Sequence, residues 1–280
     1  MSMRAETAVQ RHDRMMNEER DQAERLRTDQ GNPPDIWKGN ARRFSVALDE
    51  PPVVGVLAGL VDADASVIDV GAGGGRITIP LALHVREMVA VEPSAAMRDV
   101  LNAELERLGV QGLRVVPETW EDAKVDRADL VYAAHVTYGI PAIEPFLRKL
   151  DATAIRIAAL VTFSEPAQYW AAPFWKATYG EERLRLPCRG ELLDVLRELG
   201  AEPHVIPVDN VEAPLLGTED EAMDTLRQRL YIGRGQPHER RLRDSLARLT
   251  VMEDGGLRIN GVQENTQSVI WWEPGQMKDA

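Results

Sequence analysis

The sequence predicts an α/β protein built on a doubly wound, mostly parallel sheet of seven strands. Short β-rich runs alternate with helical stretches from about residue 66 onward, and several of these runs are apolar on both faces. Such alternation is typical of βαβ units, and strands apolar on both faces are typical of a parallel sheet covered by helices. A glycine-rich turn after the first run adds a third observation, because ligands bind at such turns in these sheets.

The expected strands are short, and five of them precede residue 165. Two more follow a less regular stretch that is rich in aromatic residues and proline. Their expected bounds are Ser66–Val70, Glu87–Val91, Leu113–Val116, Asp129–Ala133, Ala154–Phe163, His204–Val208 and Gln267–Trp272.

The clearest expected helix is Ser94–Leu108. Ser94 is placed to cap its first turn, Gly109 to end it, and Met97 begins an apolar stripe at helical spacing. Further helices are expected at 141–150, 190–199, 218–231 and 237–251.

The first 30 residues mix six basic with seven acidic side chains and hold few large apolar residues. This pattern predicts a solvated helix or a partly disordered arm. The run Asn32-Pro33-Pro34-Asp35 resembles a motif of methyltransferases acting on DNA bases, but it precedes the first strand and lacks the final aromatic residue, so we interpret it as a turn. Trp37 and Phe44 follow, in a segment expected to close over the core as a lid.

The composition is that of a globular protein, with 44% hydrophobic and 28% charged residues among 280. No apolar run reaches the roughly 18–20 residues that span a bilayer, and no signal peptide is recognisable. Cys188 is the one cysteine, which excludes an internal disulfide and a cysteine cluster for zinc, so we expect a cytoplasmic location and no metal. The net charge of −12 disfavours nucleic acid and anionic membranes as partners.

The most informative segment is Val67–Arg76, where a strand runs into the glycine-rich turn. Glu92 follows Gly71 by 21 residues at the tip of the second strand, a spacing at which a carboxylate accepts hydrogen bonds from ribose hydroxyls. Dinucleotides and S-adenosylmethionine are both bound in this way. The dinucleotide fingerprint G-x-G-x-x-G/A fits poorly, because its sixth position falls on Arg76 or on Thr78.

Asp69 separates these two ligand classes. It lies inside the first strand, two residues before Gly71, where burial of a carboxylate is unfavourable without a partner. A cationic ligand amine supplies such a partner, whereas a pyrophosphate is repelled.

These residues resemble the class I S-adenosylmethionine-dependent methyltransferases. Asp69–Gly75 matches the first motif of that family, D/E-x-G-x-G-x-G, at every fixed position. Glu92-Pro93-Ser94 matches the acidic tip of its second strand, and Asp129–His135 resembles its fourth strand. The resemblance covers roughly residues 37–210 and the last strand.

The resemblance implies a Rossmann-like methyltransferase fold with helical additions, an antiparallel final strand and S-adenosyl-L-methionine as cofactor. It implies that Met97, Trp120 and Glu121 contact the adenine and that Ala134 contacts the methionine moiety through its backbone. The expected cofactor-binding residues are Asp69, Gly71, Ala72, Gly73, Gly75, Glu92, Pro93, Met97, Trp120, Glu121 and Ala134. The expected division of the chain is an N-terminal arm or lid at 1–45, a cofactor-binding core at 46–210, a helical insertion at 211–262, and the final strand with a tail at 263–280.

Methyl transfer needs a general base only where the acceptor must lose a proton. His135 follows the fourth strand, at the edge where ligands bind, and an ordinary histidine pKa near 6.5 suits proton abstraction. Tyr138 lies in the same loop and is the second residue expected at the acceptor. For each, a packing role is the alternative.

The leading function is methyl transfer to a small organic acceptor by in-line displacement, with the acceptor bound near aromatic side chains. These are Trp37, Tyr169, Trp170, Phe174 and Trp175, for which packing on the core is the alternative role. Alternative functions are a protein or RNA methyltransferase, a non-catalytic cofactor-binding regulatory protein and a nicotinamide oxidoreductase. A homodimer is left open.

Overall fold

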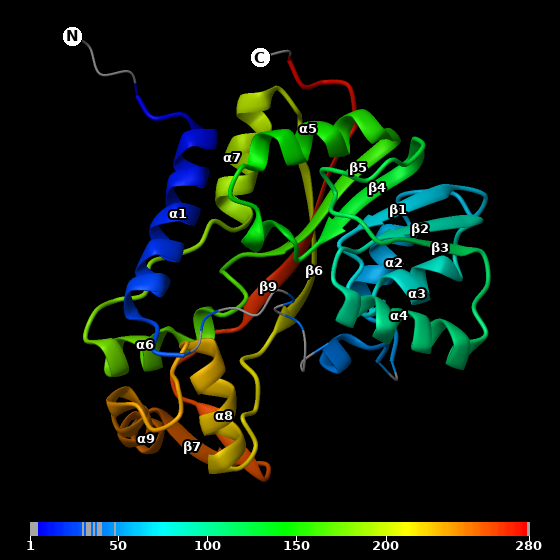
Figure 1. Cartoon of the computed structure of the whole chain (residues 1–280). Helices are drawn as coiled ribbons and strands as arrows, with labels where there is room; N and C mark the ends of the chain where they lie inside the picture. Colours follow the sequence, from blue (N-terminus) through cyan, green and yellow to red (C-terminus); the bar gives the residue numbers. More distant parts are fainter. Residues whose placement is uncertain are drawn as a thin grey trace.

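A twisted sheet runs through the centre of the protein in the computed structural model, which describes residues 5–29, 31, 35, 37, 41–47 and 49–278 (Figure 1). Within these residues seven strands form the sheet, in the order β3-β2-β1-β4-β5-β9-β6. β9 is antiparallel to both neighbours, and the other strand pairs are parallel. The predicted fold class is therefore confirmed.

The strand bounds match the sequence prediction for the first, second, third and fifth strands, and each of the other three strands is two or three residues longer than predicted. The sheet strands are β1 (Ser66–Val70), β2 (Glu87–Val91), β3 (Leu113–Val116), β4 (Ala128–Ala134), β5 (Ala154–Phe163), β6 (His204–Val211) and β9 (Asn265–Trp272). Strand order reverses between β1 and β4, and the crevice at such a point is where ligands bind in open α/β sheets.

Helices cover both faces of the sheet because alternate strand residues point to opposite sides. Val67 of β1 packs in one apolar cluster with residues of α2 and α3, and Ile68 packs in another with residues of α5 and α7. α4 lies on the same face as α3. These helices are α2 (Pro52–Ala58), α3 (Thr78–Ala82), α4 (Ala95–Leu108), α5 (Ile143–Thr153) and α7 (Arg189–Leu199).

The N-terminal arm is a packed helix, α1 (Ala8–Leu26), and not a solvated one. It lies alongside α7 and α5 (Figure 1). A narrow stripe with helical spacing is buried: His12, Met16, Glu19, Gln22 and Ala23. Three of these five side chains are polar, and for that reason the apolar pattern of the sequence did not reveal the buried face.

A small second layer sits beyond the sheet, at the lower end of the molecule in Figure 1. We call residues 169–179 and 216–259 the cap. Phe174 and Trp175 of one segment pack with Met223 and Leu242 of the other in an apolar cluster separate from those under the sheet. The cap holds η3 (Tyr169–Ala171), α6 (Ala172–Tyr179), α8 (Glu219–Arg229), α9 (Pro237–Leu249), β7 (Thr250–Glu253) and β8 (Gly256–Ile259).

The β7–β8 hairpin replaces the end of a predicted helix. The sequence predicts a helix to residue 251, but α9 ends at Leu249 and β7 pairs with β8. Asp254 and Gly255 join the two strands with φ of 50° and 79°, and positive φ at both central residues is what a two-residue type I′ hairpin turn requires. Helical and strand patterns are hard to separate in so short a segment.

In the part of the chain that the structure describes, no helix combines the length and the apolar character needed to cross a bilayer. Two short 3₁₀ helices complete the list of elements: η1 (Ala41–Phe44) and η2 (Thr137–Gly139).

A buried ion pair ties α1 to the segment that leaves the cap. Arg183 donates two hydrogen bonds to Glu19 at 2.8 and 3.1 Å, and the two side chains are only 6% and 8% exposed. The Arg183 guanidinium also stacks over the ring of Trp175. The removal of one charge from such a pair leaves the other buried without a partner.

We therefore expect Glu19→Gln to lower the free energy of unfolding by about 3–5 kcal/mol in urea denaturation. Glu18→Gln is the control, because the Arg14–Glu18 pair on the same helix is 46% and 49% exposed and such pairs contribute less than about 1 kcal/mol. The double variant Glu19→Leu/Arg183→Leu should regain most of the loss. Equal effects of the two Gln variants would contradict the assignment.

Candidate functional site

The glycine-rich loop joins β1 to α3 at the carboxyl end of the sheet. Gly71, Gly73 and Gly75 have φ of +80°, +56° and +88°, a region that side chains other than glycine rarely adopt. A Cβ at Gly71 would lie 2.5 Å from Val136 Cγ2, at the end of β4. The loop therefore approaches β4 so closely that only glycine fits at position 71.

The backbone N–H groups at the start of this loop are already paired within the protein. Those of Gly71 and Ala72 donate to the carbonyl of Val91, and that of Gly75 donates to the carbonyl of Ala72. A loop that binds a pyrophosphate needs such groups free for the phosphate oxygens. The observed pairing therefore argues against a dinucleotide at this loop.

Glu92 lies at the tip of β2, next to the loop. Its Oε2 accepts the N–H of Gly73 at 2.8 Å, and its Oε1 accepts the N–H of Ser94 at 2.7 Å. Burial raises the pKa of Glu92, while the N–H groups of Ser94 and Gly73 lower it. Each carboxylate oxygen keeps a second lone pair, so the pair of oxygens can accept two ligand hydroxyls.

Asp69 lies deeper in the sheet and is almost fully buried. Its Oδ2 accepts the hydroxyl groups of Thr78 and Tyr132, both at 2.6 Å. Its Oδ1 is buried and finds no hydrogen-bond partner in the described part of the chain. Burial raises the pKa of Asp69 to about 6, the two hydroxyls oppose this rise, and the nearby Glu92 adds to it. An oxygen of this kind suits a ligand that brings a positive charge.

The N-terminal segment covers the loop. A Cβ at Gly74 would lie 2.6 Å from the carbonyl oxygen of Phe44 in η1, so η1 rests directly on the loop. Asp35 accepts the Ser94 hydroxyl at 2.9 Å and the Ala96 N–H at 3.0 Å, at the first turn of α4. The turn expected at 32–35 thus ends in a cap for α4, although Asn32, Pro33 and Pro34 lie outside the described residues.

The other residues expected at the cofactor fall into two groups. Met97 is buried, and its sulfur would lie 3.9 Å from a Cβ built on Gly73. Pro93 follows Glu92 in the turn that leads to α4. Ala134 is the last residue of β4, beside the loop. Trp120 and Glu121 follow β3 and form the second group. The Trp120 ring is 4% exposed in the core and donates to the carbonyl of Phe146, and Glu121 is exposed.

We therefore correct the expectation that the Trp120 ring contacts the cofactor. Lys149 lies over this ring and also donates to the backbone carbonyls of residues 120, 121 and 123. The ring and Lys149 fix the segment after β3 onto α5. The sequence pattern alone does not show whether the Trp120 ring faces the cofactor or the core.

His135 adopts a left-handed backbone conformation directly after β4, with φ of 57°. Its Nε2 lies 2.7 Å from Nε2 of Gln267. An amide nitrogen only donates, so His135 Nε2 accepts and the ring proton resides on Nδ1. His135 Nδ1 is buried and lacks a partner among the described residues. Its ring stacks on Phe163 with centroids 4.5 Å apart.

Burial lowers the pKa of His135 to about 4. From the sequence we expect an ordinary histidine that takes up a proton near neutrality. The structure instead gives an imidazole that stays neutral and is a weak base, because its environment disfavours the charged form. Its free Nδ1–H is better suited to donate a hydrogen bond.

Tyr138 supports this corner of the site. Its hydroxyl pairs with Thr162 at 3.0 Å and accepts the N–H of Phe163 at 2.9 Å, and burial raises its pKa to about 12. The hydroxyl is thus engaged by β5 and stays protonated.

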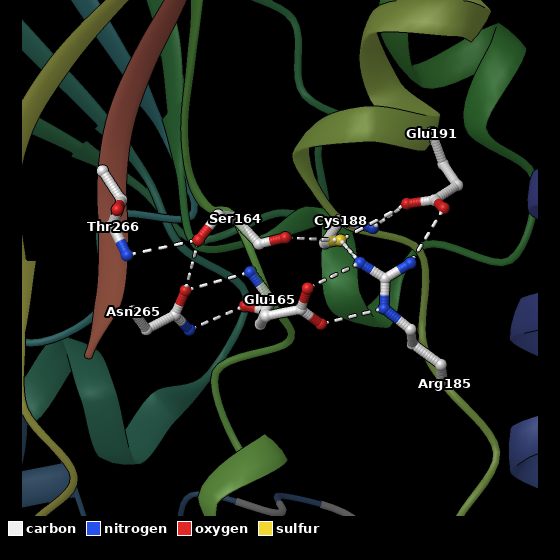
Figure 2. A network of polar contacts seen from close by, with 7 residues as sticks. All are labelled: Ser164, Glu165, Arg185, Cys188, Glu191, Asn265 and Thr266. Atoms are coloured by element: carbon white, nitrogen blue, oxygen red, sulfur yellow. Dashed lines mark hydrogen bonds and ion pairs between the residues drawn. The ribbon is translucent and has the colours of Figure 1, made fainter. Parts of the chain in front are cut away.

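Just after β5, a network of polar contacts joins residues 164–165 to residues 185–191 and 265–266 (Figure 2). Arg185 pairs with Glu165 at 2.9 Å and with Glu191 at 3.1 Å, and its guanidinium lies 2.9 Å from the Cys188 sulfur. Asn265 accepts the hydroxyl of Ser164, two residues before Gln267. Burial raises the pKa of Cys188 to about 12, so its thiol is unreactive. The network holds the ends of β5 and β9, and with them Gln267, in place.

The aromatic residues expected around the acceptor differ in burial. Phe174 and Trp175 are fully buried in the cap core, so we correct the expectation that they line an acceptor site. Tyr169 is 50% exposed, and Trp170 is partly buried. Trp37 packs edge-on against Phe44 of η1, with ring centroids 5.2 Å apart.

Across the described residues, no group of three or more histidine, cysteine, aspartate or glutamate side chains is arranged to hold a metal ion. The sequence pattern does not indicate a role at the site for Thr78 and Tyr132, which hold Asp69, or for Gln267, which holds His135. Tyr132 stands in the predicted fourth strand, but its proximity to Asp69 depends on strand register, which the sequence pattern does not give.

Comparison with known proteins agrees with this geometry. The family described as "Methyltransferase domain" matches residues 40–204, more than half of the chain. A curated relative, "Probable ribosomal RNA small subunit methyltransferase A" of Pyrobaculum aerophilum, is 31% identical over 155 residues. That match covers 54% of this chain and 63% of the relative, so the chain spans less than two thirds of its length.

Two solved structures share the fold. A candidate methyltransferase from Bacillus halodurans superimposes with a TM-score of 0.51 at 18% identity, over 79% of this chain and 96% of that one. The YcgJ protein of Bacillus subtilis gives a TM-score of 0.54 at 14% identity, over 80% and 98% of the two chains. At such identities the likeness concerns the fold alone.

The burial of Asp69 predicts how the free energy of unfolding of the ligand-free protein depends on pH. The folded-state pKa of about 6 exceeds the ordinary value near 3.9, so the folded state binds the proton more tightly. The contribution of Asp69 to the free energy of unfolding therefore falls by roughly 3 kcal/mol as pH rises from about 4 to above 6.

We expect Asp69→Asn to lack this slope in urea denaturation between pH 4 and 8. Asp129→Asn is the control, because hydrogen bonds from Ser66 lower the pKa of Asp129 and its contribution is lost only at more acidic pH. That variant should be less stable than the parent and keep the parent's slope. An Asp69→Asn variant with the parent's slope would contradict the assignment.

Proposed function

Because this chain belongs to the class I S-adenosylmethionine-dependent methyltransferases, we propose that it transfers the methyl group of S-adenosylmethionine to a small organic acceptor. One observation carries the assignment of the site: two carboxylates, Asp69 and Glu92, flank a glycine loop whose first N–H groups are already paired. This arrangement favours a ligand with an ammonium group and vicinal hydroxyls, and it disfavours a pyrophosphate.

The residues present fit the cofactor. Oδ1 of Asp69 is the free acceptor for the ammonium group, and the Glu92 carboxylate takes the ribose hydroxyls. Met97 packs next to Gly73, where the adenine would lie. Ala134 ends β4 on the methionine side.

S-adenosylmethionine supplies an electrophilic methyl group on a sulfonium. The task of the protein is then to bind, to orient and to exclude water. η1 rests on the glycine loop and shields it. His135 stays neutral at physiological pH and keeps an unpartnered Nδ1–H just after β4, and such a donor could orient an acceptor oxygen. A base with a pKa of about 4 contributes little to proton removal, so we assign His135 an orienting role.

An RNA acceptor is the second candidate, because the relative from Pyrobaculum aerophilum carries a ribosomal RNA methyltransferase name. The charge of −12 weighs against it. A protein that neutralises several phosphates needs a basic surface. The small-molecule acceptor is therefore the preferred assignment.

Calorimetric titration tests the cofactor. We expect S-adenosylmethionine and S-adenosylhomocysteine to bind with affinities on the order of micromolar, and NAD to give no binding heat. Glu92→Gln should weaken binding about ten- to a hundredfold, because hydrogen bonds to a charged group contribute roughly 1.5–3 kcal/mol.

Glu87→Gln is the matched control, since Glu87 is exposed at the opposite end of the same strand. It should bind as the parent does. NAD binding in place of the adenosyl compounds would overturn the cofactor assignment.

Fluorescence anisotropy with a labelled, structured RNA tests the acceptor class. Near physiological salt we expect no saturable binding up to tens of micromolar protein, because the acidic surface repels phosphates. Tight, saturable binding that is unaffected by excess unrelated RNA would favour the RNA acceptor over the small molecule.

A further inference from the structure

Asp69 is held through one oxygen only. Thr78 Oγ1 and Tyr132 Oη both donate to Oδ2 at 2.6 Å, and Oδ1 stays without a partner in the described residues. Two donors on the same oxygen leave the carboxylate strongly asymmetric. The second oxygen is thereby kept free.

The fold leaves these donors little freedom. Tyr132 faces Asp69 in the parallel pairing of β4 with β1, and its ring is fully buried with residues of α2 and α3. Thr78 is buried at the start of α3, directly after the glycine loop, and its hydroxyl also lies 3.4 Å from the carbonyl of Ala72. The carboxylate, its two donors and the loop are therefore one connected unit.

No described cation compensates the charge of Asp69. The groups that face it are Tyr132 from β4, Thr78 from α3 and Glu92 from β2, of which Glu92 carries a like charge. Burial raises the pKa of Tyr132 well above its usual value, so its hydroxyl remains a donor. A proton or a cationic ligand group can balance the carboxylate, and the two must then compete.

We propose that Thr78 and Tyr132 are positioning residues that stabilise ionised Asp69 through Oδ2 and reserve Oδ1 for the ammonium group of the cofactor. The proposal rests on the proposed function. It makes cofactor affinity depend on pH through Asp69, with the two hydroxyls setting the pH at which affinity is lost.

The direction of the pH dependence follows because the proton and the ammonium group of the cofactor compete for Asp69. With a pKa of about 6, Asp69 is mostly ionised at pH 7 and above, so its protonation should change the affinity little there. Below that pKa, affinity should fall about tenfold per pH unit as protons occupy the carboxylate. Glu92 also has a raised pKa, but it does not contact the two hydroxyls, so changes in Thr78 or Tyr132 identify the contribution of Asp69.

The test measures S-adenosylhomocysteine binding by calorimetry from pH 5 to 9, for the full chain and for Tyr132→Phe and Thr78→Val. Each variant removes one hydroxyl donor, so the pH of half-maximal affinity should rise by about one unit or more. For a rise of one to two units, affinity at pH 7 should fall about twofold to tenfold, and it should return to within about threefold of the parent at pH 9.

A second measurement is the number of protons released on binding. It is obtained from the binding enthalpies in two buffers that differ in ionisation enthalpy. At pH 7 both variants should release more protons on binding than the parent, because more of their Asp69 is protonated beforehand. Tyr179→Phe and Thr250→Val are the controls. They remove hydroxyls that donate to backbone carbonyls within the cap, and both should keep the parent's pH profile.

Equal loss of affinity at every pH, with unchanged proton release, would show a merely structural role and overturn the proposal. If Tyr132→Phe does not fold, Thr78→Val decides alone. A folded parent that binds no S-adenosylhomocysteine at any pH would instead refute the proposed function, and the two failures are thus distinguishable.

Discussion

The buried carboxylate of Asp69 is the constraint on which the rest of the site depends. It lies inside a parallel sheet, where an isolated charge is strongly disfavoured, and two hydroxyls compensate only one of its oxygens. The β1–β4 register that places Tyr132 beside it also sets the switch point of the strand order. The same pairing therefore creates the crevice and places the uncompensated charge at it.

The N-terminal segment packs against the sheet domain at two places. η1 lies on the glycine loop, and Asp35 links the segment before it to the first turn of α4. On the other side, α1 covers α5 and α7, and its ion pair with Arg183 reaches the segment that follows α6. Two separate parts of the N-terminal segment thus contact the loop and the surroundings of the cap.

Polar side chains account for most of what the sequence analysis missed. The buried stripe of α1 contains histidine and glutamate, and it therefore lacks the apolar periodicity that marks a packed helix. Trp120 is the opposite case, since the sequence predicts an aromatic ring that faces a ligand and the ring lies in the core. His135 was recognised by its position, but its weak basicity comes from burial and from Gln267, which is 132 residues away in the chain.

The sequence by itself determined the fold class, the bounds of most strands, the glycine loop and the spacing of Asp69 and Glu92 around it. These features are local, because strand patterns, caps and turns depend on residues close together in the chain. Only the tertiary structure decided which oxygen of Asp69 is free, which nitrogen of His135 carries the proton, and that Phe174 and Trp175 form the core of the cap. These depend on contacts between residues far apart in sequence, which strand register and packing bring together and periodicity does not encode.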